Sequence, residues 1–160
     1  MTNRPSSVPA RTAGAGPAKN ETFLKKAENP APKLFETEVR PVATVAFGGT
    51  KEAVEITPAA DFHTMELKEG DRVILDFGTH YTGHLSVQLS SVGDHPDAPA
   101  WIRFRFAERP VEFFEDPKEY KGWIARSWIQ QEETFVDVFP AELSLSRRYA
   151  MRYLMIEVVG

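Results

Sequence analysis

The chain has 160 residues with a formal net charge of −4, and it is 42% hydrophobic and 26% charged, values typical of one soluble globular domain. The mild acidity gives no basic surface for nucleic acid or an anionic membrane, and no apolar run approaches the roughly 18 residues of a membrane-spanning helix. Because the sequence contains no cysteine, disulfides, thiolate metal sites and thiolate nucleophiles are excluded.

Residues 1–20 carry three prolines, two glycines and four alanines but no aromatic side chain. Such a segment cannot bury enough apolar surface to offset its ordering entropy, so it predicts a disordered tail. It also lacks the apolar core of a secretory signal, so we expect a cytoplasmic protein. Asn20 or Thr22 can cap a helix of two turns at most that ends before Pro30, and we assign residues 21–41 to this short helix and an extended lead-in.

Residues 42–160 show the alternation and the turn signals of β structure. In the clearest strand, Ile102, Phe104 and Phe106 alternate with Arg103 and Arg105, as expected for a half-solvated antiparallel strand. The pattern predicts an all-β fold, an antiparallel β-sandwich of the jelly-roll kind, with almost no helix. The predicted strands cover residues 42–47, 53–56, 63–67, 72–77, 83–90, 101–108, 124–129, 134–138 and 149–159.

The last predicted strand is apolar on both faces. One face carries Leu154, Ile156 and Val158, and the other carries Met151, Tyr153 and Met155. A strand of this kind is expected at the centre of a sheet that is covered on both sides. We expect the core to combine this strand with its neighbours, through Leu85, Val87, Ile102, Phe104, Phe106, Leu154 and Ile156.

The segment 72–89 reads as a strand, a corner and a second strand. The two apolar sets are Val73, Leu75 and Phe77 before the corner and Leu85, Val87 and Leu89 after it. Gly78 and Gly83 lie between them and can adopt backbone conformations closed to other residues. Asp76 stands at the start of this corner, where it is either a catalytic carboxylate or a carboxylate that binds backbone N–H groups and holds the corner together.

The acidic residues and histidines suggest two kinds of chemistry, glycoside hydrolysis and metal binding. Glycoside hydrolysis requires two carboxyl groups about 5–9.5 Å apart. Acidic residues beside strands can supply such a pair or can form ion pairs with arginines, and they are Asp76, Glu108, Glu112, Glu132 and Asp137. His80 and His84 are four residues apart, which along a strand corresponds to about 13 Å, too far for one zinc ion. We expect no metal site and no cofactor.

Aromatic side chains offer a third kind of site. Trp101, Tyr120, Trp123 and Trp128 are concentrated in the middle of the chain, and Tyr81 lies at the corner. An exposed ring can stack on the apolar face of a sugar, but the same rings can also pack in a core or an interface. Trp123 follows the loop-like Tyr120-Lys121-Gly122 and is the best candidate for an exposed sugar-binding ring.

Three stretches in order resemble one known family. They are the run from Gly70 to Gly78 with its Asp-Phe-Gly end and a further glycine at Gly83, then Phe106-Ala107-Glu108, then the tyrosine-rich YAMRYLMIEV from Tyr149. Together they resemble the N-terminal β-sandwich that precedes the catalytic barrel in bacterial α-L-rhamnosidases and related glycoside hydrolases. The resemblance covers roughly residues 35–160.

The resemblance implies a non-catalytic accessory domain. The family's catalytic carboxylates lie in an α/α barrel that follows the sandwich, so no catalytic residue is carried over to this sequence, which we expect to be truncated or split from its barrel. The expected partners are that barrel, in cis or from an adjacent reading frame, and rhamnose-containing glycans bound near Trp123, Trp128, Tyr120 and Tyr81. The residues expected to be structural are Asp76, Gly78, Gly83, Glu108, Arg152 and Tyr153.

Within this interpretation, Glu108 is expected to pair with Arg103, Arg109 or Arg152. Two alternatives stay open at this point. One is a stand-alone carbohydrate-binding module that uses an aromatic platform, and the other is a small glycosidase with its own carboxylate pair.

Overall fold

The computed structural model describes residues 17–28, 35–47, 54–58, 65–93, 97–123, 125 and 129–160, and it divides into a unit 1–37 and a unit 38–160. The first unit contains helix α1, Pro17–Ala27, which confirms the predicted short helix and its end before Pro30. The predicted length and start are wrong: the helix has 11 residues, about three turns, and begins at Pro17, so Asn20 and Thr22 lie inside it and residues 17–20 are helical rather than part of the predicted tail. Proline is well tolerated in the first turn because its missing N–H has no partner there. Residues 1–16 of the predicted tail lie outside the described residues. In the part of the chain that the structure describes, no helix is long and apolar enough to span a bilayer.

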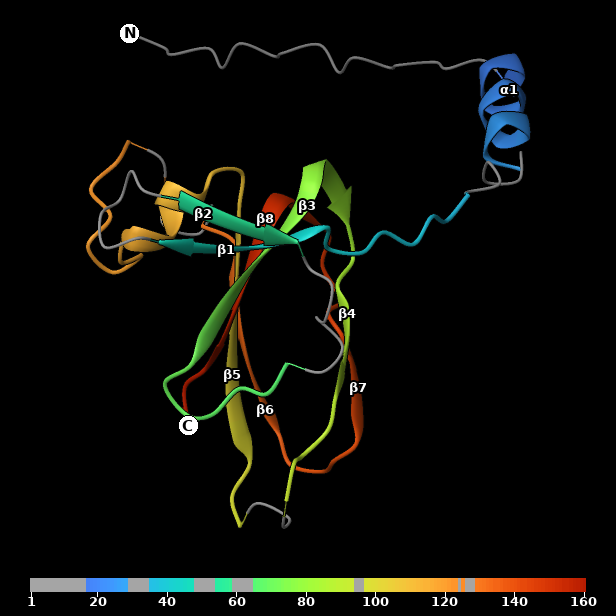
Figure 1. Cartoon of the computed structure of the whole chain (residues 1–160). Coiled ribbons are helices and arrows are strands. Elements are labelled where there is room, and N and C mark those ends of the chain that lie inside the picture. The colour runs from blue at the N-terminus through green and yellow to red at the C-terminus, as the bar shows by residue number, and fades with distance from the viewer. Residues whose placement is uncertain are drawn as a thin grey trace, which may run out of the picture. The chain divides into compact units, whose positions relative to one another are not determined.

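The second unit is an antiparallel β-sandwich, which confirms the predicted fold class (Figure 1). A six-stranded sheet has the order β2-β1-β3-β8-β5-β6, and a two-stranded sheet pairs β4 with β7. All the strand pairs are antiparallel. The strands are β1 Ala43–Phe47, β2 Val54–Pro58, β3 Arg72–Gly83, β4 Ser86–Leu89, β5 Ala100–Ala107, β6 Gln131–Val136, β7 Ala141–Ser144 and β8 Tyr149–Val158.

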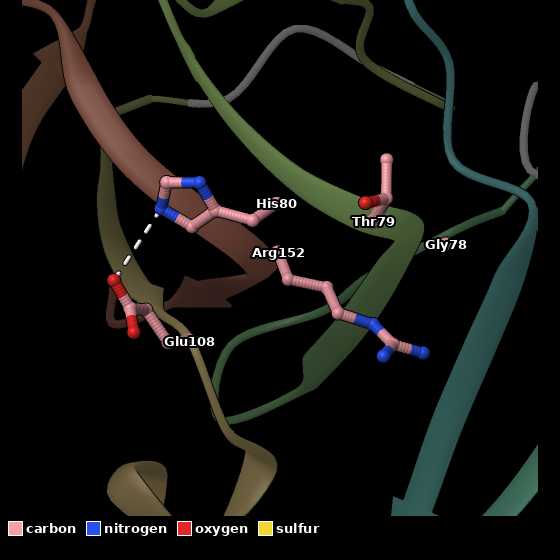
Figure 2. Close-up of a pocket in the computed structure, with 5 residues that line it drawn as sticks. All are labelled: Gly78, Thr79, His80, Glu108 and Arg152. Atoms are coloured by element: carbon pink, nitrogen blue, oxygen red, sulfur yellow. Dashed lines mark ion pairs between the residues drawn. The ribbon is translucent and has the colours of Figure 1, made fainter.

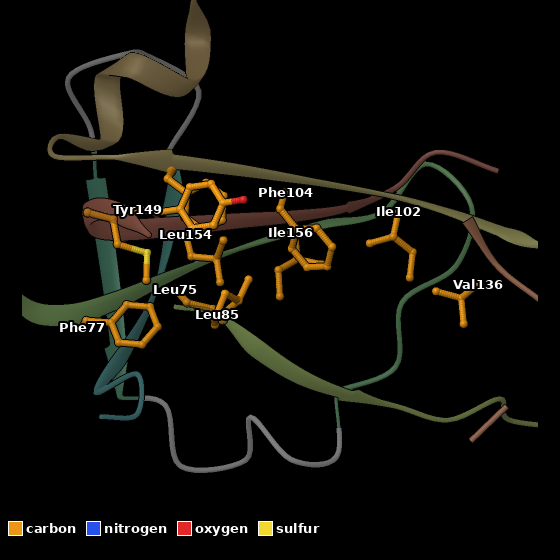
Figure 3. Packing of buried hydrophobic residues seen from close by; sticks show 11 residues of the cluster. Leu75, Phe77, Leu85, Ile102, Phe104, Val136, Tyr149, Leu154 and Ile156 are labelled. Atoms are coloured by element: carbon orange, nitrogen blue, oxygen red, sulfur yellow. The ribbon is translucent and has the colours of Figure 1, made fainter. Parts of the chain in front are cut away.

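The main core lies between the two sheets, as Figure 3 shows. Its most deeply buried members are Leu75, Phe104, Tyr149 and Leu154. The ring of Phe106 stacks on the ring of Tyr149 with centroids 3.8 Å apart. The predicted core is confirmed: Leu85, Ile102, Phe104, Phe106, Leu154 and Ile156 are buried, and Val87 packs against them half-buried.

The outer face of the six-stranded sheet carries a second apolar cluster. Tyr153 and Met155 of the central strand β8 pack there with Phe113. Phe113 belongs to a short 3-10 helix, η2, Pro110–Phe114, which the sequence pattern did not predict. The two-sided burial of β8 is therefore as expected. Met151, however, joins the main core with Tyr149 and Leu154. The reason is that the regular alternation of inward-facing and outward-facing side chains along β8 is interrupted at Arg152.

That change coincides with an irregularity in β3. Asp76 pairs with Tyr153 while Tyr81 pairs with Met151, so residues 77–80 lie opposite Arg152 alone. The strand continues through this bulge to Gly83, and the predicted corner after Phe77 is wrong. The chain passes to the second sheet only at His84 and Leu85. A bulge interrupts the two-residue alternation of a strand, so a prediction from alternation alone ends the strand at the bulge.

Other boundaries also differ from the predicted ones. Residues 65–67 form no strand, while His63 and Thr64 lie outside the described residues. Ala125 and Ile129 are not in a strand, and the rest of the predicted strand 124–129 lies outside the described residues. Strand β6 begins at Gln131, three residues before the predicted start, and β7 was not predicted.

Candidate functional site

Asp76 and Arg152 form the central polar contact of the bulge. Asp76 is only 3% exposed. Arg152 donates from Nε to Oδ1 and from Nη2 to Oδ2, both at 2.9 Å, and the N–H of Gly78 donates to Oδ1 at 2.7 Å. These hydrogen bonds, led by those from Arg152, hold the pKa of Asp76 below its usual value despite the opposing effect of burial. Asp76 is therefore an ionised carboxylate whose bonds join β3, β8 and the bulge.

Gly78 and Gly83 differ in what they require of the backbone. Gly78 has φ of +81°, a conformation that strains other residues, and a Cβ there would lie 3.2 Å from a methyl group of Val42. Gly83 has no positive φ, and a Cβ at this position would meet no atom within 4 Å. Of the two glycines singled out in the sequence, only Gly78 is demanded by the local conformation.

An open hollow of about 440 Å³ lies over the bulge (Figure 2). It is lined by Gly78, Thr79, His80, Glu108 and Arg152. Nε2 of His80 lies 3.3 Å from Oε1 of Glu108, and at least half of each side chain is exposed. The bulge places Thr79 and His80 at the rim, next to the end of β5, where Glu108 follows. The hollow thus presents hydroxyl, imidazole and carboxylate groups to a polar ligand.

The predicted arginine partner of Glu108 is not found among the described residues. Arg103 binds Glu133 and Glu157 instead, and Arg152 binds Asp76. The backbone N–H of Arg109 donates to Glu112, at the start of η2. Glu108 therefore has His80 as its partner, brought close by the bulge rather than by strand alternation.

Tyr153 is a packing residue beside this site. It is buried in the outer-face cluster, and Cζ of Arg152 lies 5.0 Å from the centroid of its ring. Burial raises the pKa of Tyr153, and the charge of Asp76 acts in the same direction. The phenol therefore stays neutral, and its ring supports the guanidinium that binds Asp76.

The electrostatics of Asp76 and Glu133 argue against acid catalysis by these two carboxyl groups. A glycosidase general acid needs a raised pKa so that it is protonated when it acts. Asp76 and Glu133 have lowered pKa values, in both cases chiefly because an arginine hydrogen-bonds the carboxylate.

In the described part of the chain, no group of three or more His, Asp or Glu side chains could hold a metal ion.

The structure describes three of the four predicted sugar-binding aromatic residues, and their exposure differs. Trp123 is 94% exposed. Tyr120 is half-buried, with its ring against Gly122. Tyr81 is half-buried against the main core, and Trp128 lies outside the described residues. Among the three residues that the structure describes, Trp123 thus has the ring that is most accessible to a ligand.

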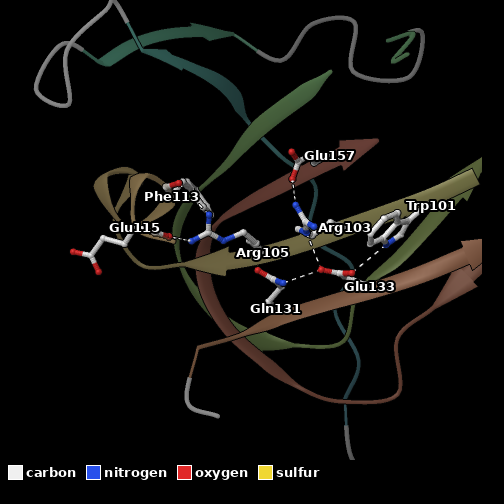
Figure 4. Close-up of polar contacts among 8 residues, drawn as sticks. All are labelled: Trp101, Arg103, Arg105, Phe113, Glu115, Gln131, Glu133 and Glu157. Atoms are coloured by element: carbon white, nitrogen blue, oxygen red, sulfur yellow. Dashed lines mark hydrogen bonds and ion pairs between the residues drawn. The ribbon is translucent and has the colours of Figure 1, made fainter. Parts of the chain in front are cut away.

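A polar cluster that the sequence did not reveal lies on the outer face of the six-stranded sheet (Figure 4). Arg103 donates from Nε to Glu133 at 2.8 Å and from Nη1 to Glu157 at 2.9 Å. Glu133 also accepts from Nε1 of Trp101 at 3.1 Å, and the Trp101 ring stacks on Phe135 with centroids 5.6 Å apart. Alternation predicts that Trp101 and Arg103 point outward together. It does not predict that Phe135 and Glu133 lie opposite them, because the pairing of β5 with β6 leaves no pattern in the local sequence.

Comparison with known proteins gives consistent matches. A family model described as the glycosyl hydrolase family 78 alpha-rhamnosidase N-terminal domain matches residues 43–160. Among solved structures, the chain is similar to a rhamnosidase from Klebsiella oxytoca with rhamnose bound, at 39% identity and a TM-score of 0.74. The match covers 88% of this chain and 28% of that chain, so this chain spans less than a third of the rhamnosidase. No curated protein matches the chain.

Proposed function

The chain belongs to the family of glycosyl hydrolase family 78 α-rhamnosidase N-terminal domains, and we propose that it is the non-catalytic accessory sandwich of a rhamnosidase-like glycoside hydrolase. The resemblance seen in the sequence motifs is confirmed at the level of the family. The observation that carries the proposal is the extent of the structural match, since nearly the whole chain corresponds to a small part of a much longer rhamnosidase.

In this proposal the chemistry belongs to a partner. We propose that the sandwich packs against a catalytic α/α barrel, supplied in cis or by an adjacent reading frame, and stabilises it. The hollow over the bulge, with Thr79, His80 and Glu108 at its surface, would then form one wall of the sugar cleft. Support for a non-catalytic role comes from Asp76 and Glu133, whose arginine-bound carboxylates are unsuited to protonate a leaving group.

The test is a two-domain protein in which the full 160-residue chain replaces the matched segment of the Klebsiella oxytoca rhamnosidase. We expect this fused protein to hydrolyse an aryl rhamnoside, and we expect the same rhamnosidase without any sandwich to lose activity or aggregate. The matched control carries Phe104→Ala, which removes a fully buried ring and should cancel the rescue. Full activity of the rhamnosidase lacking a sandwich would contradict the proposal.

A second measurement addresses the small-glycosidase alternative. The isolated chain incubated with the aryl rhamnoside should give no turnover. Turnover that Asp76→Asn abolishes while the circular dichroism spectrum is unchanged would make Asp76 catalytic and would overturn the accessory role.

The second candidate function is a stand-alone carbohydrate-binding module, and the near-complete exposure of Trp123 favours it. A ring this exposed can stack on the apolar face of a pyranose. Rhamnose titrated into the chain should then change the tryptophan fluorescence, and Trp123→Ala should abolish that change. A fluorescence response that persists in this variant would show that Trp123 does not bind the sugar.

A further inference from the structure

The outer face of the six-stranded sheet is covered over only part of its area. At one end, the helix η2 lies over the sheet, and its position is held by Arg105, which donates to the carbonyl groups of Glu112, Phe113 and Glu115 (Figure 4). At the other end lies a group that we name the Trp101 patch, formed by Trp101, Arg103, Glu133, Phe135 and Glu157. Within the described residues, no element comparable to η2 covers this patch, and Phe135 is 67% exposed.

The polar atoms of the Trp101 patch are largely satisfied by one another. Glu133 accepts from Trp101, Arg103 and Gln131, and Arg103 is held between Glu133 and Glu157. Each charged group of the patch therefore has an oppositely charged partner within it, so a surface that covers the patch has only one excess negative charge to match. Its exposed ring, Phe135, and its arginine are residue types that are enriched in protein interfaces.

The end of β8 lies beside the same patch. The N–H of Val159 donates to the carbonyl of Trp101, and the N–H of Trp101 donates to the carbonyl of Gly160. In the matching family this sandwich is an N-terminal domain, so the domain that follows it leaves from the end of β8. A domain attached there starts next to the Trp101 patch, because the last two residues are hydrogen-bonded to the backbone of Trp101.

We propose that the Trp101 patch is the docking surface for the catalytic domain that follows the sandwich in this family. The inference rests on the accessory role proposed above and adds where the two domains touch. Two carboxylates share one guanidinium in the patch, which leaves a net charge of −1 from Glu133, Arg103 and Glu157. The partner surface should therefore offer an apolar side chain to Phe135 and an N–H donor or a cation near the carboxylates.

The test is hydroxyl-radical footprinting of the full chain alone and of the fused protein with the Klebsiella oxytoca catalytic segment. We expect modification of Trp101 and Phe135 to fall several-fold in the fused protein. Ile56 is the internal reference, because it is 60% exposed and lies on β2, at the opposite edge of the sheet. Its modification rate should be the same in both proteins.

A pair of variants gives an independent readout. Phe135→Ser should lower the Tm of the fused protein more than the Tm of the isolated chain, while Ile56→Ser should shift both by the same amount. Equal footprinting rates at Phe135 in an active fused protein would overturn the docking surface and leave the accessory role standing. Equal rates in an inactive fused protein would overturn both.

Other occupants of the patch have distinct signatures. Protection of Phe135 that grows with the concentration of the isolated chain would assign the patch to a second copy of the chain. Protection of the isolated chain by added rhamnose would assign it to a sugar. Either result, with no added protection in the fused protein, would overturn the proposal.

Discussion

The guanidinium of Arg152 binds both carboxylate oxygens of Asp76 at 2.9 Å, although 76 residues separate the two positions in the chain. The same carboxylate accepts the N–H of Gly78, and the carbonyl of Asp76 accepts the N–H of Val42. Asp76 thus joins β3 to its neighbour β8 and to the residue that leads into β1. A buried carboxylate with these partners stabilises the bulge that shapes the hollow beside it.

Removing the charge of Asp76 should destabilise the fold. Asp76→Asn keeps the shape of the side chain but weakens the paired bonds from Arg152, and hydrogen bonds to charged groups contribute about 1.5–3 kcal/mol. We expect a loss of this size in the free energy of unfolding, measured in urea. Asp137→Asn is the matched control, because Asp137 is exposed, and it should change the free energy of unfolding very little. Equal effects of the two substitutions would contradict the structural role of Asp76.

The two glycines of the bulge region should respond differently to alanine. At Gly78 a side chain is strained by the positive φ and also crowds Val42, so Gly78→Ala should cost about 1–2 kcal/mol of unfolding free energy. At Gly83 a Cβ meets no atom within 4 Å, so Gly83→Ala should be neutral or stabilise by about 0.4–1 kcal/mol. Thermal and urea unfolding of the two variants measure this difference in unfolding free energy. A similar cost at both positions would refute the prediction.

Stability should decline in acid through specific carboxylates. Asp76 has a folded-state pKa below its unfolded value, so its contribution is fully present above the unfolded pKa of about 4 and is lost as pH falls toward the folded value. Glu133, with its lowered pKa, adds to this loss in the same direction. Unfolding free energies measured from neutral pH into strong acid should therefore fall most steeply below about pH 4. In Asp76→Asn this decline should be shallower, and an unchanged slope would exclude Asp76 as its source.

Stability should also decline in alkali, through Tyr149. Burial, with a hydrogen bond to Glu132 in second place, raises the pKa of Tyr149 from 10.0 to about 12. The stabilising contribution is then present below pH 10.0 and is lost as pH rises through about 12, because the unfolded state ionises first. Unfolding measured across this alkaline range, with phenolate absorbance as a second signal, should show this loss. Tyr149→Phe lacks the ionising group and should lose less stability over the same range.

Replacing a buried phenylalanine should destabilise the fold far more than replacing an exposed phenylalanine on the adjacent strand. Phe104 is fully buried, and Phe104→Ala should cost about 3–5 kcal/mol, enough to unfold a marginally stable domain. Phe135 is mostly exposed on β6, and Phe135→Ala should cost less than about 1 kcal/mol in the isolated chain. Circular dichroism and thermal unfolding distinguish the two. A large loss from Phe135→Ala would mean that its ring supports the fold of the isolated chain rather than a surface for docking.

The sequence by itself determined the fold class, most of the core and the family. Side-chain alternation is a local property, so Ile102, Phe104 and Phe106 could be assigned to the core from their spacing alone. The two apolar faces of the last strand likewise indicated that β8 would be central. The motifs around Asp76, Glu108 and Tyr153 carried the family resemblance without any knowledge of their contacts.

Only the tertiary structure decided which residues meet. The bulge in β3 has no signature in a two-residue period, so alternation predicts a strand end at Phe77 and gives no indication that His80 pairs with Glu108. The partners of Asp76 and of Trp101 come from strands far away in the chain, and their register is set by the packing of two sheets rather than by local propensity. The sequence could therefore specify which side chains face the core, while the contacts that form the hollow and the Trp101 patch depend on how distant strands align.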